Sequence, residues 1–293
     1  MKRVLIINAD DLGYTHGVNR SVAQCYRQGI LTSATLMANG PAFEDAIAMV
    51  KDNPALGVGI HLVLTELQPL SRPDEIPGLL DKGGRLLPTP GALLTALLRG
   101  KVSQPAMHKE LARQVSKVLD YGLTPTHLDS HMHVHVLPQV FAVVLDIAQT
   151  YGIQWVRNPF EQAAAWRSFP LLQQRQRLTF CKQYLQAMLV TLYRSRFFRD
   201  VRRAGLRTPD HMFGIALTGI WSETAIRHLL SQLPPGINEL MVHPGVYDEE
   251  LRQRPTRLHE ARGRERDLLL SASLKDLLQR YDITLSRYGE EVT

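Results

Sequence analysis

The stretch PTHLDSHMHVHVLP, residues 125–138, carries a histidine or an aspartate at every second position. Alternate side chains of an extended strand point to the same face, so this spacing predicts a strand with one polar face. The row on that face consists of His127, Asp129, His131, His133 and His135. Imidazoles and carboxylates are the usual ligands of hydrolytic metal sites, so the row indicates a metal site. The alternative is a polar strand that lines a wet pocket without a metal.

The row is too long to surround one ion. An extended strand rises by about 3.3 Å per residue, which makes the row more than about 20 Å long. We therefore expect one or two of its members to be ligands. The others would orient those ligands or contact a substrate.

Strand-like and helix-like patterns alternate on both sides of this stretch. Further buried strands are expected at residues 3–8, 31–38, 57–64, 153–157, 211–215, 238–243 and 283–285. Helices are expected at about 18–28, 41–51, 92–98, 106–121, 138–151, 222–233 and 264–280. Such alternation predicts an α/β fold with a parallel sheet and crossover helices. The number of units favours a distorted (β/α), TIM-like barrel in one domain, residues 1–293, with a helical insertion at about 159–209.

Four more polar residues lie where predicted strands end, namely Asp10, Asp11, His61 and His243. Each is a weak signal alone, because Asp often caps a helix and a lone His is more often a satisfied core residue. In a barrel, however, the carboxyl ends of all strands meet at one face. A carboxylate and two imidazoles leave positions on a divalent ion for water and substrate. Because Asp10 and Asp11 are adjacent, we expect one to bind the ion and the other to handle protons.

The composition is that of a globular protein, with 44% hydrophobic and 21% charged residues. The two cysteines suit neither a disulfide framework nor a zinc knuckle. That cysteine usage agrees with a reducing cytoplasm, where we expect the protein to lie. The first residues, MKRVLIINADD, are expected to form a strand and not a signal peptide. The net charge of +6 permits contact with anionic lipid, and we expect no nucleic-acid partner. The oligomeric state is left open, a homodimer included.

Six motifs together are similar to one known family. They are NADDLG at 8–13, GILTSATLMANG at 29–40, GIHLVL at 59–64, THLDSHMHVH at 126–135, HPG at 243–245 and LLLSASLKDLL at 268–278. In their order and spacing they resemble the YdjC/ChbG carbohydrate deacetylases from end to end. This resemblance implies a metal-dependent enzyme that removes the acetyl group from N-acetylated sugars on a barrel-like scaffold.

The resemblance also implies roles for individual residues. Matched motif by motif, the ligands of one divalent ion, Mg or Zn, would be Asp11, His61 and His131. The proton-transfer carboxylate would be Asp10, and His243 is our candidate acid for the leaving amine, with the two roles open to exchange. The remaining residues of the row divide into His127 and Asp129, which would orient ligands, and His133 and His135, which would line the pocket.

Two further segments resemble a branch of this family. DEIPGLLDKGGRL at 74–86 and AGLRTPDHMFGIALTG at 204–219 are similar to the hopanoid-associated HpnK branch. That resemblance implies an N-acetylglucosaminyl lipid, a hopanoid glycolipid, as the substrate, with acetate and the free amino sugar as products.

The insertion at 159–209 is basic and apolar together, with ten Lys or Arg against Glu161 and Asp200. Within it, QYLQAMLVTLYRSRFFRDVRR at 183–203 has the spacing of an amphipathic helix followed by an arginine cluster. This pattern is typical of a helix on an anionic membrane surface, and also of a helix packed on a barrel with a solvated basic flank. With the lipid resemblance, we expect peripheral contact with the inner membrane surface.

Three other functions remain as alternatives. A soluble chitooligosaccharide deacetylase would use the same catalytic residues and differ only in what the sugar is attached to. A metal-dependent phosphoesterase usually gathers two ions with more carboxylates than this chain places together. A non-catalytic lipid- or RNA-binding protein would have no need of the polar strand ends.

Overall fold

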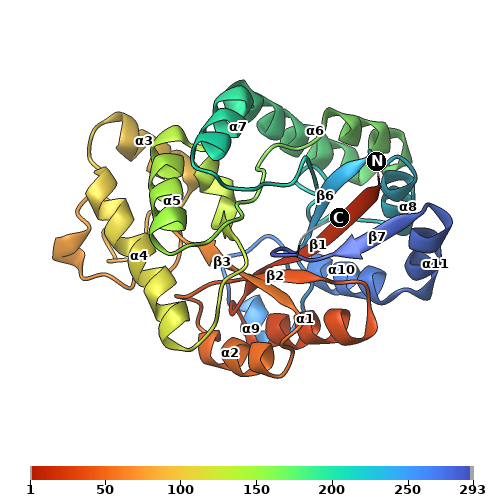
Figure 1. Ribbon diagram of the computed structural model, residues 1–293, viewed down its shortest axis with the longest axis horizontal. Coiled ribbons are helices and arrows are strands. Elements are labelled where there is room, and N and C mark those ends of the chain that lie inside the picture. Colours follow the sequence, from red (N-terminus) through yellow and green to blue (C-terminus); the bar gives the residue numbers. More distant parts are fainter. Residues whose placement is uncertain (1, 291–293) are drawn as a thin grey trace.

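The computed structural model describes residues 2–290, and its centre is one curled parallel sheet (Figure 1). The strands are β1 (Arg3–Leu12), β2 (Ser33–Leu36), β3 (Gly57–Leu62), β4 (Leu128–Ser130), β5 (His211–Phe213), β6 (Gly236–Val242) and β7 (Ile283–Ser286). Their order is β4-β3-β2-β1-β6-β5, and β7 pairs with the first residues of β1. The central strand β1 is buried on both faces after Arg3, which explains its continuous apolar run VLII.

The gap between β4 and β5 is spanned by an irregular segment. Single bridges join Leu128 to Val156 and Glu161 to Met212, so residues 156–161 connect the two edges of the sheet. The strand expected at 153–157 is therefore reduced to isolated bridges. The predicted distorted (β/α) barrel is confirmed as a half-barrel of regular strands with helices around it.

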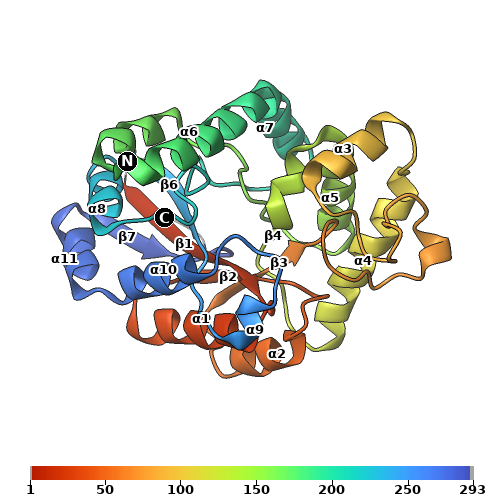
Figure 2. The same cartoon turned by 180° about the vertical axis from the view of Figure 1, so that it is seen from behind.

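Helices cover the outside of the sheet and alternate with its strands (Figure 2). They are α1 (His16–Gln28), α2 (Phe43–Lys51), α3 (Pro90–Leu98), α4 (Gln104–Asp120), α5 (Pro138–Thr150), α8 (Glu223–Ser231), α9 (Glu249–Arg252), α10 (Glu260–Leu270) and α11 (Ala272–Arg280). A short 3₁₀ turn, η1, covers Pro73–Glu75. The single helix expected at 264–280 is divided, because Ser271 has the extended backbone angles φ −65° and ψ 125°. Within residues 2–290, no helix combines the length and the apolar character that crossing a bilayer requires.

The histidine stretch is not one extended strand, and that prediction is wrong beyond Ser130. The pairing of β4 with β3 ends where Ser130 lies opposite Leu62. The chain then forms a 3₁₀ turn, η2 (His131–Val136), in which Met132 and His133 have positive φ. With no strand left to pair with, the turn is closed by the Ser130 hydroxyl, which accepts a hydrogen bond from the His135 backbone N–H at 3.0 Å.

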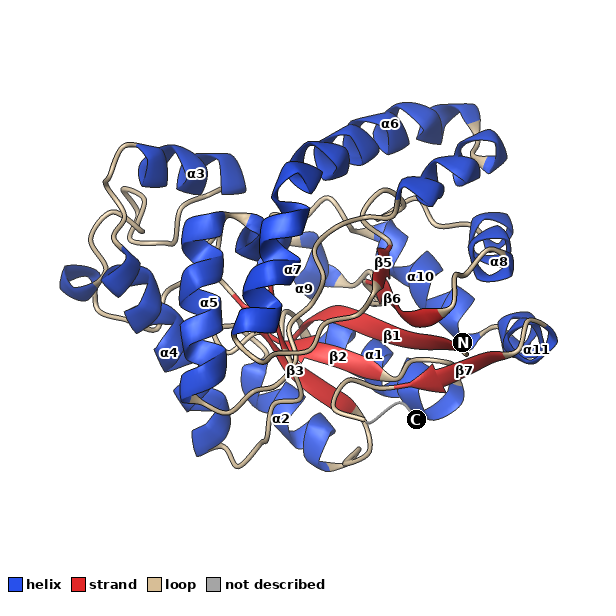
Figure 3. Ribbon diagram, turned by 45° about the horizontal axis from the view of Figure 1, so that its top comes forward, coloured by secondary structure: helices blue, strands red, loops and turns tan. Residues whose placement is uncertain are grey.

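The segment at 159–209 is mostly helical. It contains η3 (Ala163–Leu171), α6 (Gln174–Leu189), η4 (Val190–Tyr193) and α7 (Arg194–Arg203). Aromatic rings of Trp166, Phe180 and Tyr184 pack α6 against η3. Helices α3 and α6 lie along the same edge of the molecule in Figure 3, although about eighty residues separate them in the sequence.

Candidate active site

A β-bulge near the end of β1 brings two adjacent carboxylates to one pocket. The register of β1 against β2 shifts between Ala9 and Leu12, and Asp11 has a left-handed backbone with φ 66°. An extra residue in a strand changes the alternation of faces, so consecutive side chains can reach the same side. Asp10 and Asp11 accordingly both line the same cavity. Their hydrogen-bond partners differ, since Arg157 donates to Asp10 and Arg262 donates to Asp11.

Asp11 lies between two imidazoles. Its Oδ1 is 3.1 Å from Nδ1 of His131 and 3.5 Å from Nε2 of His61, and its Oδ2 accepts a 2.6 Å hydrogen bond from Arg262. One ligand atom from each of the three predicted metal residues lies within 4.8 Å of the others. Burial alone would raise the pKa of Asp11, but Arg262 and the two histidines hold that pKa well below its usual range. The structure thus brings Asp11, His61 and His131 together as an ionised carboxylate with two imidazoles.

Each imidazole is oriented by a second carboxylate. Nδ1 of His61 is 2.7 Å from Asp129, and Nε2 of His131 is 3.1 Å from Glu66. A histidine whose distal nitrogen is held by a carboxylate presents its other nitrogen as a fixed and more basic ligand. Burial opposes the charged form of His61, yet Asp129, Asp11 and Asp10 outweigh it and raise the pKa of His61 to about 10. This negative surrounding favours a cation at the shared position.

Asp10 belongs to a second charged cluster, centred on the fully buried Arg157. The guanidinium donates to both oxygens of Asp10, at 2.8 and 2.6 Å, and also binds Asp129 and Glu239. Glu239 accepts a further hydrogen bond from the Tyr288 hydroxyl at 2.5 Å. Burial would raise the pKa of Asp10, but the bidentate contact with Arg157 holds that pKa well below its usual range. Asp10 is therefore ionised and fixed in orientation.

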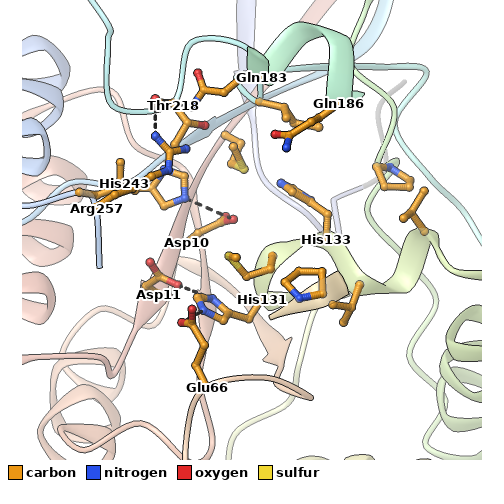
Figure 4. A pocket seen from close by; sticks show the side chains of 18 of the residues that line it. Asp10, Asp11, Glu66, His131, His133, Gln183, Gln186, Thr218, His243 and Arg257 are labelled. Atoms are coloured by element: carbon orange, nitrogen blue, oxygen red, sulfur yellow. Dashed lines mark hydrogen bonds and ion pairs between the residues drawn. The ribbon is translucent and has the colours of Figure 1, made fainter. Parts of the chain in front are cut away.

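His243 follows directly after β6 and faces Asp10, with Nε2 4.0 Å from its Oδ2 (Figure 4). Its backbone N–H donates to Glu265 at 2.6 Å, and its Nδ1 has no hydrogen-bond partner among the described residues. Burial lowers the pKa of His243 to about 4, so the ring is neutral near pH 7. A neutral imidazole and an ionised carboxylate that lie side by side can together accept one proton.

The other histidines of the stretch have separate environments. His127 is buried behind the site, where its ring stacks on Tyr288 at a centroid distance of 3.6 Å. Nδ1 of His135 is 2.6 Å from the Ser130 hydroxyl, and this contact supports the η2 turn. His133 lines the cavity. Burial lowers the pKa of all three rings, which keeps them neutral. Of the two histidines expected to line the pocket, His133 lies on the cavity and His135 does not. His127, expected to orient a ligand, stacks on Tyr288 instead.

Five of the predicted site residues form the floor of a cavity of about 720 Å³, namely Asp10, Asp11, His61, His131 and His243. One wall comes from α3 and η2, with Leu94 and Met132 among its residues, and the opposite wall comes from α6 and η4. Figure 4 shows Gln183, Gln186 and Thr218 facing the floor from above. The Oε1 atom of Gln183 and Nδ1 of His133 are buried without a hydrogen-bond partner among the described residues. Both residues line the cavity.

Sequence reasoning missed several of these residues. Arg157 is the last residue of the strand expected at 153–157. Polar residues at strand ends are candidate site residues, and the same rule would have included Arg157. Glu66 follows β3 in a loop and has a positive φ of 72°, which no sequence pattern indicated. Arg262 and Glu265 reach the floor from α10, a helix interior where charged residues are normally read as solvent-facing.

The fold and site together define an α/β barrel with a buried Asp–His–His cluster at its strand ends. The family profile described as YdjC-like protein matches residues 4–280. A carbohydrate deacetylase from Brevibacillus brevis is 32% identical over 98% of both chains. The chain therefore belongs to the YdjC-like family, which confirms the resemblance seen in its motifs.

Other relatives match over part of the chain. A carbohydrate deacetylase from Geobacillus stearothermophilus is 46% identical over 52% of this chain and 59% of its own length. A chitooligosaccharide deacetylase from Salmonella paratyphi B is 43% identical over 52% of this chain and 58% of its own length. The matched region is thus less than two thirds of these two relatives. The crystal structure of a putative cellobiose-phosphate cleavage protein from Enterococcus faecalis shares the fold, with a TM-score of 0.77 and 24% identity over 98% of each chain.

Proposed function

We propose that this protein is a metal-dependent carbohydrate N-deacetylase that releases acetate from an N-acetylglucosaminyl lipid, a hopanoid glycolipid, and leaves the free amino sugar. The observation that carries the proposal is the Asp11–His61–His131 cluster beside Asp10 and His243 on the floor of a sugar-sized cavity. The deacetylase activity named for the relatives supports the reaction class. We further propose that residues 1–293 act as one domain at the cytoplasmic face of the inner membrane.

The residues present fit one divalent ion, Mg or Zn. The two histidines keep their distal nitrogens bound to carboxylates, so their other nitrogens remain available at the position they share with Asp11. When bound there, a divalent ion polarises an acetyl carbonyl and lowers the pKa of water. Asp11, His61 and His131 would hold the ion, and Arg262 would keep the carboxylate of Asp11 in place.

Proton transfer falls to Asp10 and His243. Hydrolysis of the amide takes one proton from water and returns one to the leaving nitrogen, so a single carrier pair suffices. Asp10 is ionised and His243 is neutral, and therefore both can accept a proton. The 4.0 Å between Oδ2 and Nε2 places them on the same side of the floor. We propose that Asp10 accepts the proton from water and that the pair returns it to the amine.

The upper part of the cavity would bind the sugar ring. Gln183, Gln186 and Thr218 line this part, and side-chain amides and hydroxyls can donate to and accept from the hydroxyl groups of a sugar. Around them the walls are apolar, with Leu94 from α3 and Val190 from η4. An apolar wall suits the lipid part of the substrate better than a second sugar. The two segments that resemble the hopanoid-associated branch support the same choice.

A chitooligosaccharide deacetylase is the second candidate. The relative from Salmonella paratyphi B is named a chitooligosaccharide deacetylase, and it matches about half of this chain. The two candidates share every floor residue and differ in what lies at the cavity mouth. A two-ion phosphoesterase is disfavoured, because the second group of possible ligands includes Asp10 and Asp129, both bound to Arg157. The guanidinium supplies the positive charge that a second ion would bring.

The test combines metal content with acetate release. The purified protein is stripped with a chelator, reloaded with Mg or Zn, and its metal content is measured by elemental analysis. Acetate release is then followed with an N-acetylglucosaminyl lipid and with diacetylchitobiose. The proposal expects one ion per chain and faster release from the lipid. Faster release from diacetylchitobiose would select the second candidate, and release by the stripped protein would refute metal dependence.

A further inference from the structure

Helix α6 and the turn η4 carry leucines that point to solvent. A helix that only packs on a barrel would have polar residues on that side. The exposed fractions are 81% for Leu178, 61% for Leu185, 62% for Leu189 and 86% for Leu192. At a helical spacing of 3.6 residues, Leu178, Leu185 and Leu189 share one face. The opposite face carries Phe180 and Ala187, which are buried. The helix is therefore already packed, and its outer leucines form a second apolar face.

A second helix presents leucines across the cavity mouth. On α3, Leu94 is 37% and Leu98 is 73% exposed. Leu94 lines one wall of the cavity, and Gln186 of α6 and Val190 of η4 line the opposite wall. Both helices lie along the same edge of the molecule (Figure 3). We call this surface the leucine rim, which consists of Leu94, Leu98, Leu178, Leu185, Leu189 and Leu192.

The two segments that carry the leucine rim contain cations and no carboxylates. The sequence holds no Asp or Glu between residues 162 and 199, and none between 82 and 109. Among the cations of these segments, Arg175 and Lys182 are exposed on α6, and Arg99 and Lys101 are exposed after α3. Apolar side chains mixed with cations are the surface that binds anionic bilayers. Two copies of the rim would instead bring cation against cation, which opposes self-association.

We propose that the leucine rim docks on an anionic lipid bilayer and holds the cavity mouth against it. The leucines would insert between headgroups, and the flanking cations would contact anionic headgroups. The N-acetylated sugar of a bilayer-held glycolipid would then enter the cavity without leaving the surface. This last step rests on the proposed lipid substrate, whereas the docking itself does not.

Vesicle sedimentation tests the docking. The full-length protein is mixed with vesicles of phosphatidylcholine alone or with phosphatidylglycerol, at low and at high salt. We expect binding to the anionic vesicles at low salt. The triple variant Leu185→Ser/Leu189→Ser/Leu192→Ser should bind at least about tenfold more weakly, because buried leucine side chains supply the apolar part of the interaction. The double variant Arg175→Glu/Lys182→Glu should lose the part of vesicle binding that depends on salt.

Matched variants and a soluble substrate separate docking from folding and from catalysis. Leu98→Ser should weaken vesicle binding, whereas Leu285→Ser, on β7 at 36% exposure, should not. Circular dichroism melting checks that each variant is folded, and turnover of diacetylchitobiose should stay within about twofold of wild type because no rim change reaches the floor. Wild type that stays in the supernatant with anionic vesicles overturns the proposal. A wild-type dimer that the triple variant dissociates, seen by light scattering, overturns it in favour of a second copy. Vesicle binding without any deacetylation would leave the docking standing and refute the proposed function.

Discussion

The adjacent carboxylates Asp10 and Asp11 are both ionised beside an arginine, but their other partners differ. Asp10 is satisfied by the protein itself, because Arg157 donates to both of its oxygens. Asp11 has one oxygen bound to Arg262 and the other directed at two histidines whose distal nitrogens are already held. The Asp10 side of the floor is neutralised by Arg157, and the Asp11 side is the group that we propose holds the metal ion.

The difference depends on the bulge near the end of β1. A regular strand would have sent the two side chains to opposite faces of the sheet. The shift of register in β1 puts both in one cavity, each near a different arginine. The chemistry proposed here uses this division, because it assigns the ion to Asp11 and the proton transfer to Asp10 together with His243.

The largest effect is expected on the Asp11 side. His61→Ala or His131→Ala should remove metal binding and abolish turnover while the protein stays folded, since each change deletes one of three protein ligands. Elemental analysis and acetate release measure the two quantities. His133→Ala, a change in the same turn as His131, is the matched control and should keep the ion. Metal content that is normal in all three variants would show that the ligand set is wrong.

A large effect on rate alone is expected on the Asp10 side. Asp10→Asn should keep the ion but lose about 10²–10⁴-fold in turnover, the range of general acid–base catalysis. Asp11→Asn should lower the affinity for the ion instead. Isothermal titration with the metal, beside steady-state kinetics, distinguishes these results. The comparison between the two sides fails if both variants lose the same affinity and the same rate.

A smaller effect, on stability, is expected at Arg157. Arg157→Met keeps much of the side-chain volume but leaves the carboxylates of Asp10, Asp129 and Glu239 without their buried cation. Loss of one partner from a buried ion pair typically lowers the free energy of unfolding by about 3–5 kcal/mol. Urea denaturation of wild type and variant measures this free energy. Arg20→Met, which removes an exposed ion pair with Asp248, is the control and should change little. Similar small changes in both variants would contradict the assigned role of Arg157.

The smallest effect concerns Glu161, which lies outside both clusters. Burial raises the pKa of Glu161 to about 7, although its carboxylate accepts hydrogen bonds from Gly214 and Ala216. Between the ordinary pKa of 4.5 and about 7, the folded state then binds more protons than the unfolded state. Its contribution to stability is present below pH 4.5 and is lost as the pH rises through 7.

The corresponding experiment compares unfolding curves at pH 5 and pH 8. Glu161→Gln should reduce the loss of unfolding free energy over this range by on the order of 1 kcal/mol, since one pKa unit corresponds to about 1.4 kcal/mol. Glu265 has a pKa raised by burial to the same value and should keep the remaining dependence. An unchanged slope in Glu161→Gln would show that this carboxylate does not titrate in the range.

The strand ends are predictable because buried parallel strands have long apolar runs that stop at polar residues. That rule alone places Asp11, His61 and His243 at one end of the sheet. It does not show that the row at 127–135 leaves its strand after Ser130, since a period of two is also compatible with a turn once the partner strand ends. Nor does it place Arg262, which reaches the floor from a helix far along the chain. Tertiary contact, and not local pattern, determines such positions.

In the insertion at 159–209, too, the sequence predicts only part of the structure. The sequence predicts one stripe for the apolar residues at 184–193, but Tyr184 packs on Trp166 while Leu192 is exposed on the η4 turn. The helical spacing does not continue through that turn, so the sequence alone overestimates the length of the face. The concentration of basic residues there is visible from the sequence. Which leucines remain exposed is not.

The contacts of Arg157 also bear on how the chain folds. This side chain joins Asp10 and Glu239, which are 147 and 82 positions away in the sequence, and Tyr288 closes the cluster from 49 positions beyond Glu239. Closing loops of this length costs conformational entropy before the contacts form, so we expect the cluster to form late in folding. Until then its carboxylates and its guanidinium remain hydrated. The barrel interior can exclude water only when distant parts of the chain have met, and a half-folded intermediate would have no active floor.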